Sequence, residues 1–315
     1  MGKYQDYANK PTEFLALTGY TLEEFEALQP HFSQHFYERM RAYRLDGKPR
    51  GKRQYSDYAN SPLPTPADKL IFILNDLKTN NLQSVQGAFF GMSQPKANQW
   101  LHTLQTVLNQ TLASLGELPV RQMEKLGFDE HDRLYFHDGT ERPIQRPAQA
   151  EAQQEFYSGK KKKKKRHSLK NNLMINPACK ILFLTETVAG KTHDKKLADE
   201  SGYTLPPGSR LAQDTGFQGF ALEHVTILQP KKKPRGHALS DWDKHLNHWL
   251  ASLRIRMEHA IGGVKRYRIV KDKIRNWKKG FRDAVMETCC GLHNFRLNFR
   301  PWHYDPIQLH LLAPF

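Results

Sequence analysis

The chain has 315 residues, 38% of them apolar, which is enough for two or three domains of ordinary size. Its 48 lysines and arginines outnumber 32 aspartates and glutamates, and the net charge of +16 predicts a polyanionic partner rather than a neutral substrate. Nucleic acid is therefore the first partner to consider. No apolar run approaches the ~20 residues of a membrane span, and no helical pattern pairs a lysine-rich face with a broad apolar one, so we expect no membrane partner.

The cysteines and the first residues point to a reducing compartment. Cys179, Cys289 and Cys290 show no Cys-x-x-Cys spacing, so we expect no cysteine zinc site, and the last two are best explained as small buried residues of a helix. The opening residues lack the apolar core of a secretory signal. We expect a cytoplasmic protein.

Residues 1–60 form an N-terminal helical and basic segment whose role stays open. Thr21 is followed by Glu24 at the spacing of a capping box, which predicts a helix over residues 21–40. Residues 41–66 are basic and rich in turn-forming residues, so they predict a linker or a loop that faces DNA.

Residues 61–120 predict an all-α helix-turn-helix domain. Apolar residues at helical spacing follow Ala67, and residues 82–112 have the pattern of two short helices around Gly91, with Ser93 as the N-cap of the second. An ordinary helical hairpin is the alternative. On the second helix the residues expected to face inward are Ala97, Leu101, Leu104 and Leu108. Those left near its N-terminus to meet DNA are Gln94, Lys96, Asn98 and Gln99.

Beyond residue 125 the pattern changes to short apolar and β-branched runs, which predict strands over 134–138, 167–176, 180–187, 209–214 and 224–228. Residues 193–201 predict a short helix that Asp194 caps. Residues 240–264 predict a long one, whose expected apolar stripe is Trp242, Leu246, Trp249, Leu253, Met257, Ile261 and Val264. The order predicts an α/β domain over 125–300 with an RNase H-like mixed sheet flanked by helices, and 301–315 would be a C-terminal tail.

Three acids stand where such a fold could hold metal ions. Asp138 and Asp214 each follow an apolar run at the end of a predicted strand, and Glu258 lies on the long helix beside its apolar stripe. Taken singly, each aspartate could be a turn former or a cap, and the glutamate a surface charge. Their joint order of strand, strand and helix favours a shared site, where oxygen ligands would suit two Mg²⁺ or Mn²⁺ ions acting on a phosphodiester.

The motifs that carry these acids resemble those of DDE-class transposases of the insertion-sequence and Harbinger type, in particular the bacterial IS-five group. The matching segments are HDGTERP at 137–143, the basic segment within 156–170, HDKKL at 193–197, LAQDTGFQG at 211–219 and RIRMEHAIGGVKR at 254–266. The resemblance covers most of residues 130–300, and residues 65–110 resemble the helix-turn-helix that precedes this catalytic domain in related elements.

The resemblance places the catalytic and metal-binding acids of the family on Asp138, Asp214 and Glu258. It implies an RNase H-like fold, a divalent metal, recognition of terminal inverted repeats, and cleavage followed by joining of the 3′-hydroxyl to target DNA. Transposases join two ends, so a homodimer or larger assembly is expected by analogy. The site of action would be the nucleoid of a bacterial cell.

Basic residues around the acids predict a track for the DNA backbone. They are Lys160, Lys161, Lys162, Lys163, Lys164, Lys165 and Arg166 between the first two predicted strands, then Arg254, Lys265 and Arg266 near the glutamate. A solvated charge run or a nuclear signal is the alternative for the lysines.

Two other functions fit the same sequence. An RNase H-like endonuclease would use the same acids to cleave DNA without strand transfer. A domesticated DNA-binding protein would do no chemistry, although the presence of all three acids argues against it.

Overall fold

The computed structural model describes residues 3–129, 133–158, 166–234 and 236–302. The lysine run 160–165 lies outside these residues. The chain divides into two compact units, the first formed by residues 1–118, 264–272 and 278–299, the second by 119–263, 273–277 and 300–315. Residues 278–299 thus pack with the N-terminal helices, although the sequence had placed them in the α/β domain. The division into residues 1–60, 61–120 and 125–300 as functional segments stays a prediction.

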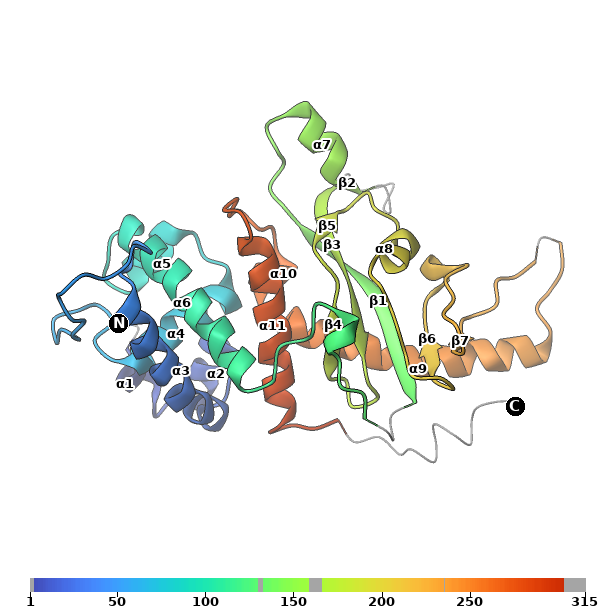
Figure 1. Cartoon of the computed structure of the whole chain (residues 1–315), viewed down its shortest axis with the longest axis horizontal. Helices are drawn as coiled ribbons and strands as arrows, with labels where there is room; N and C mark the ends of the chain where they lie inside the picture. The colour runs from blue at the N-terminus through green and yellow to red at the C-terminus, as the bar shows by residue number, and fades with distance from the viewer. Residues whose placement is uncertain (1–2, 130–132, 159–165, 235, 303–315) are drawn as a thin grey trace. The chain divides into compact units, whose positions relative to one another are not determined.

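The first unit is helical (Figure 1). Its helices are α1 (Tyr4–Tyr7), α2 (Pro11–Thr18), α3 (Leu22–Ala42), α4 (Pro66–Thr79), α5 (Gln83–Phe89), α6 (Gln94–Ser114), α10 (Arg268–Lys271) and α11 (Phe281–Leu297). The capping box at the start of α3 is confirmed, because Thr21 Oγ1 accepts from the Glu24 backbone N–H and Glu24 Oε2 accepts from that of Thr21. The N-terminal all-α region expected from the sequence is present.

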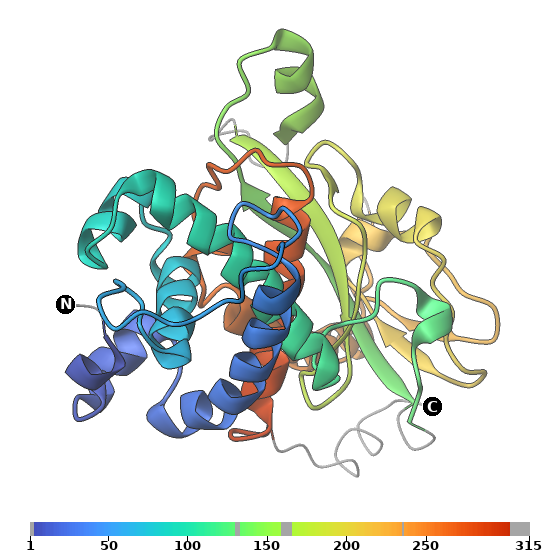
Figure 2. The same cartoon turned by 60° about the vertical axis from the view of Figure 1, so that its left-hand side comes forward.

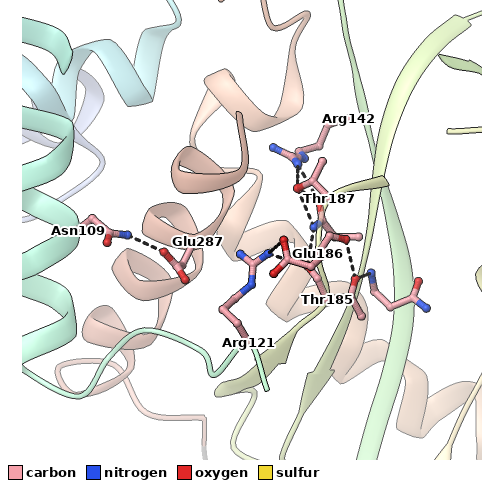
Figure 3. A network of polar contacts seen from close by, with 9 residues as sticks. Asn109, Arg121, Arg142, Thr185, Glu186, Thr187 and Glu287 are labelled. Carbon is pink, nitrogen blue, oxygen red and sulfur yellow. Dashed lines mark hydrogen bonds and ion pairs between the residues drawn. The ribbon is translucent and has the colours of Figure 1, made fainter. Parts of the chain in front are cut away.

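Helix α11 completes the core of this unit from the far end of the sequence. Tyr20 Oη donates to the Leu292 carbonyl at 2.9 Å, Gln105 donates to Thr288 Oγ1 at 2.8 Å, and Glu287 accepts from Asn109 at 3.0 Å (Figure 3). Both predicted helical cysteines, Cys289 and Cys290, are fully buried on α11, as expected. These contacts join residues 170 or more positions apart, which explains why a sequence boundary near residue 120 separates segments that fold together.

Helices α5 and α6 form the predicted pair around Gly91. Ser93 is the N-cap residue of α6, and Ala97, Leu101, Leu104 and Leu108 are all buried, so the predicted inward face is confirmed. A Cβ on Gly87 of α5 would lie 2.7 Å from the Met92 carbonyl oxygen, so only glycine permits this close approach to the turn.

The second unit is built on a seven-stranded mixed sheet (Figures 1 and 2). Its strands are β1 (Leu134–Pro143), β2 (Tyr157–Ser158), β3 (Arg166–Ile175), β4 (Ile181–Leu184), β5 (Val188–Ala189), β6 (Arg210–Ala212) and β7 (Thr226–Leu228). The order is β2-β3-β1-β6-β7, with β4 and β5 also paired to β3. The long pair β1 and β3 is antiparallel, whereas β1, β6 and β7 run parallel. All five predicted strands are present, and β2 and β5 were not anticipated.

Polar side chains tie the interior of this sheet together. Buried Arg142 on β1 donates to Asn171 Oδ1 of β3 at 2.8 Å and to Thr187 Oγ1 at 3.0 Å. Figure 3 shows Arg142 reaching Thr187, and Arg121 pairing with Glu186 at 3.3 Å two residues before β5. The segment from β4 to β5 is therefore fixed to both long strands.

Short helices cover one face of the sheet. Helix α8 (Asp194–Glu200) and the 3-10 turn η2 (Thr215–Phe217) pack on an aromatic cluster that includes Tyr135, Phe183 and Phe220. Helix α7 (Ala150–Phe156) precedes β2, and the 3-10 turn η1 (Met123–Lys125) precedes β1. Helix α8 is confirmed, but the expected role of Asp194 as its cap was wrong: the N-cap residue is His193, and Asp194 is the first helical residue.

The long helix α9 (Asp241–Val264) is confirmed within one residue of its predicted start. It contacts the end of β6 through Arg254, and the turn between β3 and β4 through Arg256, whose Nη1 donates to the Pro177 carbonyl at 2.9 Å. Figure 1 shows α9 running behind the strands. The apolar stripe is buried at Leu253, Met257 and Val264, whereas Trp242 was wrongly placed in it, because 63% of its surface is exposed.

Within the described ranges, no helix is long and apolar enough to cross a membrane.

Candidate active site

Strand pairing sets the two aspartates side by side. In the parallel register of β1 and β6, Phe136 lies opposite Ala212, the last residue of β6, and each aspartate follows two residues later. Asp138 lies within β1, which continues to Pro143, so its predicted place at a strand end was wrong, whereas Asp214 lies just beyond β6. The residues immediately before them are joined, since His137 Nε2 lies 2.8 Å from Gln213 Oε1. Because the glutamine oxygen can only accept, the imidazole donates from Nε2. This buried hydrogen bond fixes the spacing between β1 and the end of β6 at the point where the two acids follow.

The imidazole of His137 is part of the core on the face opposite Asp138. Its ring centroid lies 4.1 Å from that of Phe217 and 5.3 Å from that of Phe220. Burial lowers the pKa of His137 to about 4, against smaller opposite effects of the Gln213 hydrogen bond and the Asp194 charge. The histidine is therefore neutral at pH 7, and its role is to join strands rather than to carry charge.

Asp138 is a mostly buried carboxyl beside other charges. Its pKa is raised to about 6, mainly by burial and to a smaller extent by the negative charges of Asp214 and Asp194, while the Gly139 backbone N–H and the Arg254 guanidinium act against this. The Gly139 N–H donates to Asp138 Oδ1 at 2.7 Å. Burial disfavours the charged form of this carboxyl, and a bound cation would stabilise that form.

Asp214 is turned toward the long helix. It is the N-cap residue of η2, and its Oδ1 accepts from the Thr215 backbone N–H at 2.6 Å. The same oxygen lies 3.3 Å from Arg254 Nη1 of α9. Helix α9 thus presents a cation to the strand-end acid, and the predicted DNA-contact residue Arg254 lies within the site itself.

Glu258 lies one helical turn beyond Arg254, on the same side of α9. Its side chain is exposed, and the contacts of the described residues do not bring its carboxylate to either aspartate. The neighbouring His259 ring stacks on Trp302 with centroids 4.5 Å apart. The structure therefore groups Asp138 and Asp214 closely and places Glu258 at their edge.

The carboxylates of Asp138 and Asp214 are candidate ligands for a divalent ion. Over the described part of the chain, no three His, Cys, Asp or Glu side chains are already gathered closely enough to hold a metal. Asp138 and Asp214 nevertheless fit such an ion, because they supply hard carboxylate oxygens. In addition, the positive charge of Arg254 only partly offsets the burial of the Asp138 carboxylate. Arg254 now neutralises Asp214 where a cation would otherwise do so.

Sequence reasoning missed the contact made by Asp194, an acid that is more deeply buried than Asp138 or Asp214. Its Oδ1 forms a buried ion pair with Lys170 Nζ at 3.0 Å, on the face of the sheet that α8 covers. The HDKKL segment drew attention to Asp194, but the pairing with β3 depends on residues 24 positions apart and has no local sequence signal.

The predicted DNA-contact residues fall in several places. On α6, Gln94, Lys96 and Gln99 are exposed and Asn98 is partly so, and the amides of Gln94 and Asn98 both donate to Gln83 Oε1 of α5. Arg166 is exposed at the start of β3, while Lys265 and Arg266 are partly buried in the first unit. Lys160 to Lys165 lie outside the described residues, and DNA contact by all of these residues stays a prediction.

A mixed sheet that carries Asp138 on β1 and Asp214 just beyond the neighbouring strand β6, next to a helix carrying Arg254 and Glu258, defines an α/β protein with an acidic site on the sheet. Residues 137–294, just over half of the chain, match the model of the DDE superfamily endonuclease family. The chain belongs to this family. It is similar to a probable transposase for insertion sequence element IS702 of Microchaete diplosiphon, with 28% identity over 211 residues that cover 67% of this chain and 73% of that protein.

A second relative is a putative transposase for insertion sequence element IS112 of Streptomyces albus G. It is 24% identical over 208 residues, which cover 65% of this chain and 71% of that protein. No solved structure matches the chain. The expected DDE resemblance is therefore confirmed.

Proposed function

We propose that the protein is an insertion-sequence transposase that binds the terminal inverted repeats of its element, cleaves DNA and joins the 3′ ends to target DNA. The observation that carries this proposal is that Asp138 on β1 and Asp214 just beyond β6 directly follow two residues that are joined across these strands, within a chain of the DDE endonuclease family. The names of the two similar transposases support strand transfer over simple hydrolysis.

The sheet supports an RNase H-like fold for this domain. A long antiparallel pair, β1 and β3, is combined with two short strands, β6 and β7, that run parallel to β1, and helix α9 contacts Asp214 just beyond β6. The α5 and α6 pair, with its buried inner face and exposed amides, supports a helix-turn-helix reader of the element ends.

In this proposal, Asp138 and Asp214 would hold divalent ions, with Glu258 joining from α9. Two Mg²⁺ or Mn²⁺ ions, when bound, would activate the attacking oxygen and stabilise the leaving one. Arg254 would leave Asp214 and pair with a phosphate of the scissile strand, a change of partner that costs little because its side chain is only partly buried. His137 and Gln213 keep the two aspartates at a fixed spacing.

Basic residues outside the site would bind the DNA backbone. With a net charge of +16, the protein binds backbone phosphates through Lys160 to Arg166, Lys265 and Arg266, which gives affinity without sequence choice. Joining two ends requires a homodimer or a larger assembly acting at the bacterial nucleoid.

A joining assay with inverted-repeat DNA, supercoiled plasmid target and Mg²⁺ tests the proposal. We expect metal-dependent cleavage and a product in which the 3′ end is covalently joined to the plasmid. Nicking without any joined product would instead favour an RNase H-like endonuclease, and binding without cleavage would favour a domesticated DNA-binding protein.

A further inference from the structure

The ion pair of Lys170 and Asp194 is nearly removed from solvent. Their side chains are 2% and 5% exposed, and Lys170 Nζ lies 3.0 Å from Asp194 Oδ1. The same ammonium donates to the Thr192 carbonyl, and the Asn172 amide donates to the Asp194 carbonyl at 3.0 Å. Two residues of β3 thus hold the start of α8 against the sheet.

The Asp194 carboxylate occupies space that two glycines leave open. A Cβ added to Gly139 would lie 2.8 Å from Asp194 Oδ1, and one added to Gly216 would lie 3.2 Å from Oδ2. Gly139 directly follows Asp138, and Gly216 is the second residue after Asp214. One buried carboxylate therefore packs on the backbone behind both candidate metal ligands, from the face of the sheet opposite to α9.

Stability alone does not account for this arrangement. Removing two charges from water is unfavourable, and a buried ion pair is often no more stabilising than apolar residues of the same volume. Its geometry is specific, however, because the charges fix where the carboxylate stands. A site that needs two ligands at a set separation is one where such specificity is useful.

We propose that Asp194, locked by Lys170, is a positioning residue that sets the separation of Asp138 and Asp214 by packing its carboxylate between Gly139 and Gly216. This inference rests on the proposed function, since it gives the two aspartates a shared ligand. Asp194 itself touches neither metal nor DNA in this account and acts through the backbone of its neighbours.

A titration of the full-length protein with Mn²⁺ in the absence of DNA tests this role directly. Electron paramagnetic resonance measures the concentration of free Mn²⁺ at each step. Asp194→Asn keeps the side-chain shape but loses the ionic lock, and we expect its Mn²⁺ affinity to fall roughly 10- to 100-fold, the usual effect of altering a residue that orients metal ligands. The control is Asp199→Asn, which changes an exposed acid on the same helix that pairs with Lys195. We expect this variant to keep wild-type Mn²⁺ affinity.

A second variant leaves every charge in place. Gly139→Ala adds a methyl group that must displace the Asp194 carboxylate or the strand, so we expect the same loss of Mn²⁺ affinity in a protein that still unfolds cooperatively. Gly127→Ala, whose added Cβ meets no atom within 4 Å, is its control. This variant also serves if Asp194→Asn fails to fold because buried Lys170 keeps only the more distant Glu141 as an acidic partner, at 3.8 Å.

The outcomes separate this inference from the proposed function. Mn²⁺ affinity equal to wild type in Gly139→Ala, or in folded Asp194→Asn, would overturn the positioning role even if the wild type joins DNA ends. Wild-type protein that binds Mn²⁺ through Asp138 but never joins ends would refute the transposase proposal, while the loss of affinity in both variants would still support the positioning role.

Discussion

His137 Nε2 lies 2.8 Å from Gln213 Oε1, so the residues that immediately precede the two candidate acids are joined by a buried hydrogen bond. Alternation along a strand then sends the next side chain of β1, Asp138, to the opposite face. The core on one face and the acids on the other are thereby held by the same contact between β1 and the end of β6.

The neutral state of His137 predicts a loss of stability in acid. Its folded pKa, about 4, is below the 6.5 of an exposed histidine, so its contribution is complete above pH 6.5 and is lost as the pH falls toward 4. The size is at most about 3 kcal/mol. Denaturant unfolding of wild type and His137→Phe at pH 7 and pH 4 should show a smaller acid loss for the variant. The control is His248→Phe, at an exposed position. Equal losses in wild type and His137→Phe would contradict the assignment.

Asp138 predicts the opposite pH dependence one residue away. Its folded pKa, about 6, is above the 3.8 of an exposed aspartate, so the metal-free fold is favoured below pH 4 and loses this advantage as the pH rises through 6. In EDTA at pH 7, Asp138→Asn should be more stable than wild type by up to about 3 kcal/mol, with little difference at pH 4. Lower stability of the Asn variant at pH 7 would mean that the carboxylate serves the fold.

Local sequence signals predicted five strands and the long helix but not the two-residue strands β2 and β5, and the assignment of the three acids as one site stays a prediction. Alternating apolar runs gave β1, β3, β4, β6 and β7, and helical spacing gave α9, because these patterns depend on neighbouring residues. The bond between His137 and Gln213, and the pair of Lys170 and Asp194, depend on strand order and could not be read from either segment alone. The assignment of α11 to the helical unit has the same cause.

The lysine run predicts a strong salt dependence of DNA binding. Replacing Lys160 to Lys165 by alanine should weaken binding to element ends and to unrelated DNA alike. Each lost phosphate contact reduces the slope of log affinity against log salt by ~0.9, so the six replacements should reduce it by up to about 5. Binding isotherms at several salt concentrations measure this slope. The control replaces Lys195 and Lys196 on α8, and a slope unchanged by the six alanines would place the DNA elsewhere.

The amides of α6 predict sequence choice. Gln94→Ala and Asn98→Ala should each reduce discrimination between element ends and scrambled DNA by about 1–3 kcal/mol, as the loss of a base contact does, whereas Lys96→Ala should weaken both equally. Competition binding separates the two effects. Gln34→Ala, an exposed amide on α3, is the matched control. Unchanged discrimination in both amide variants would remove α6 as the reading helix.

In the proposed function, Asp138, Asp214 and Glu258 together perform the chemistry. The most direct measurement compares end cleavage and joining by Asp138→Asn, Asp214→Asn and Glu258→Gln with the wild type in Mg²⁺. Asp241→Asn, an exposed acid on the same helix as Glu258, is the control. We predict that each of the three variants still binds the ends but neither cleaves nor joins them, while the control does both. Metal-dependent cleavage retained by any of the three would contradict the assignment of that acid, and retention by all three would refute the site.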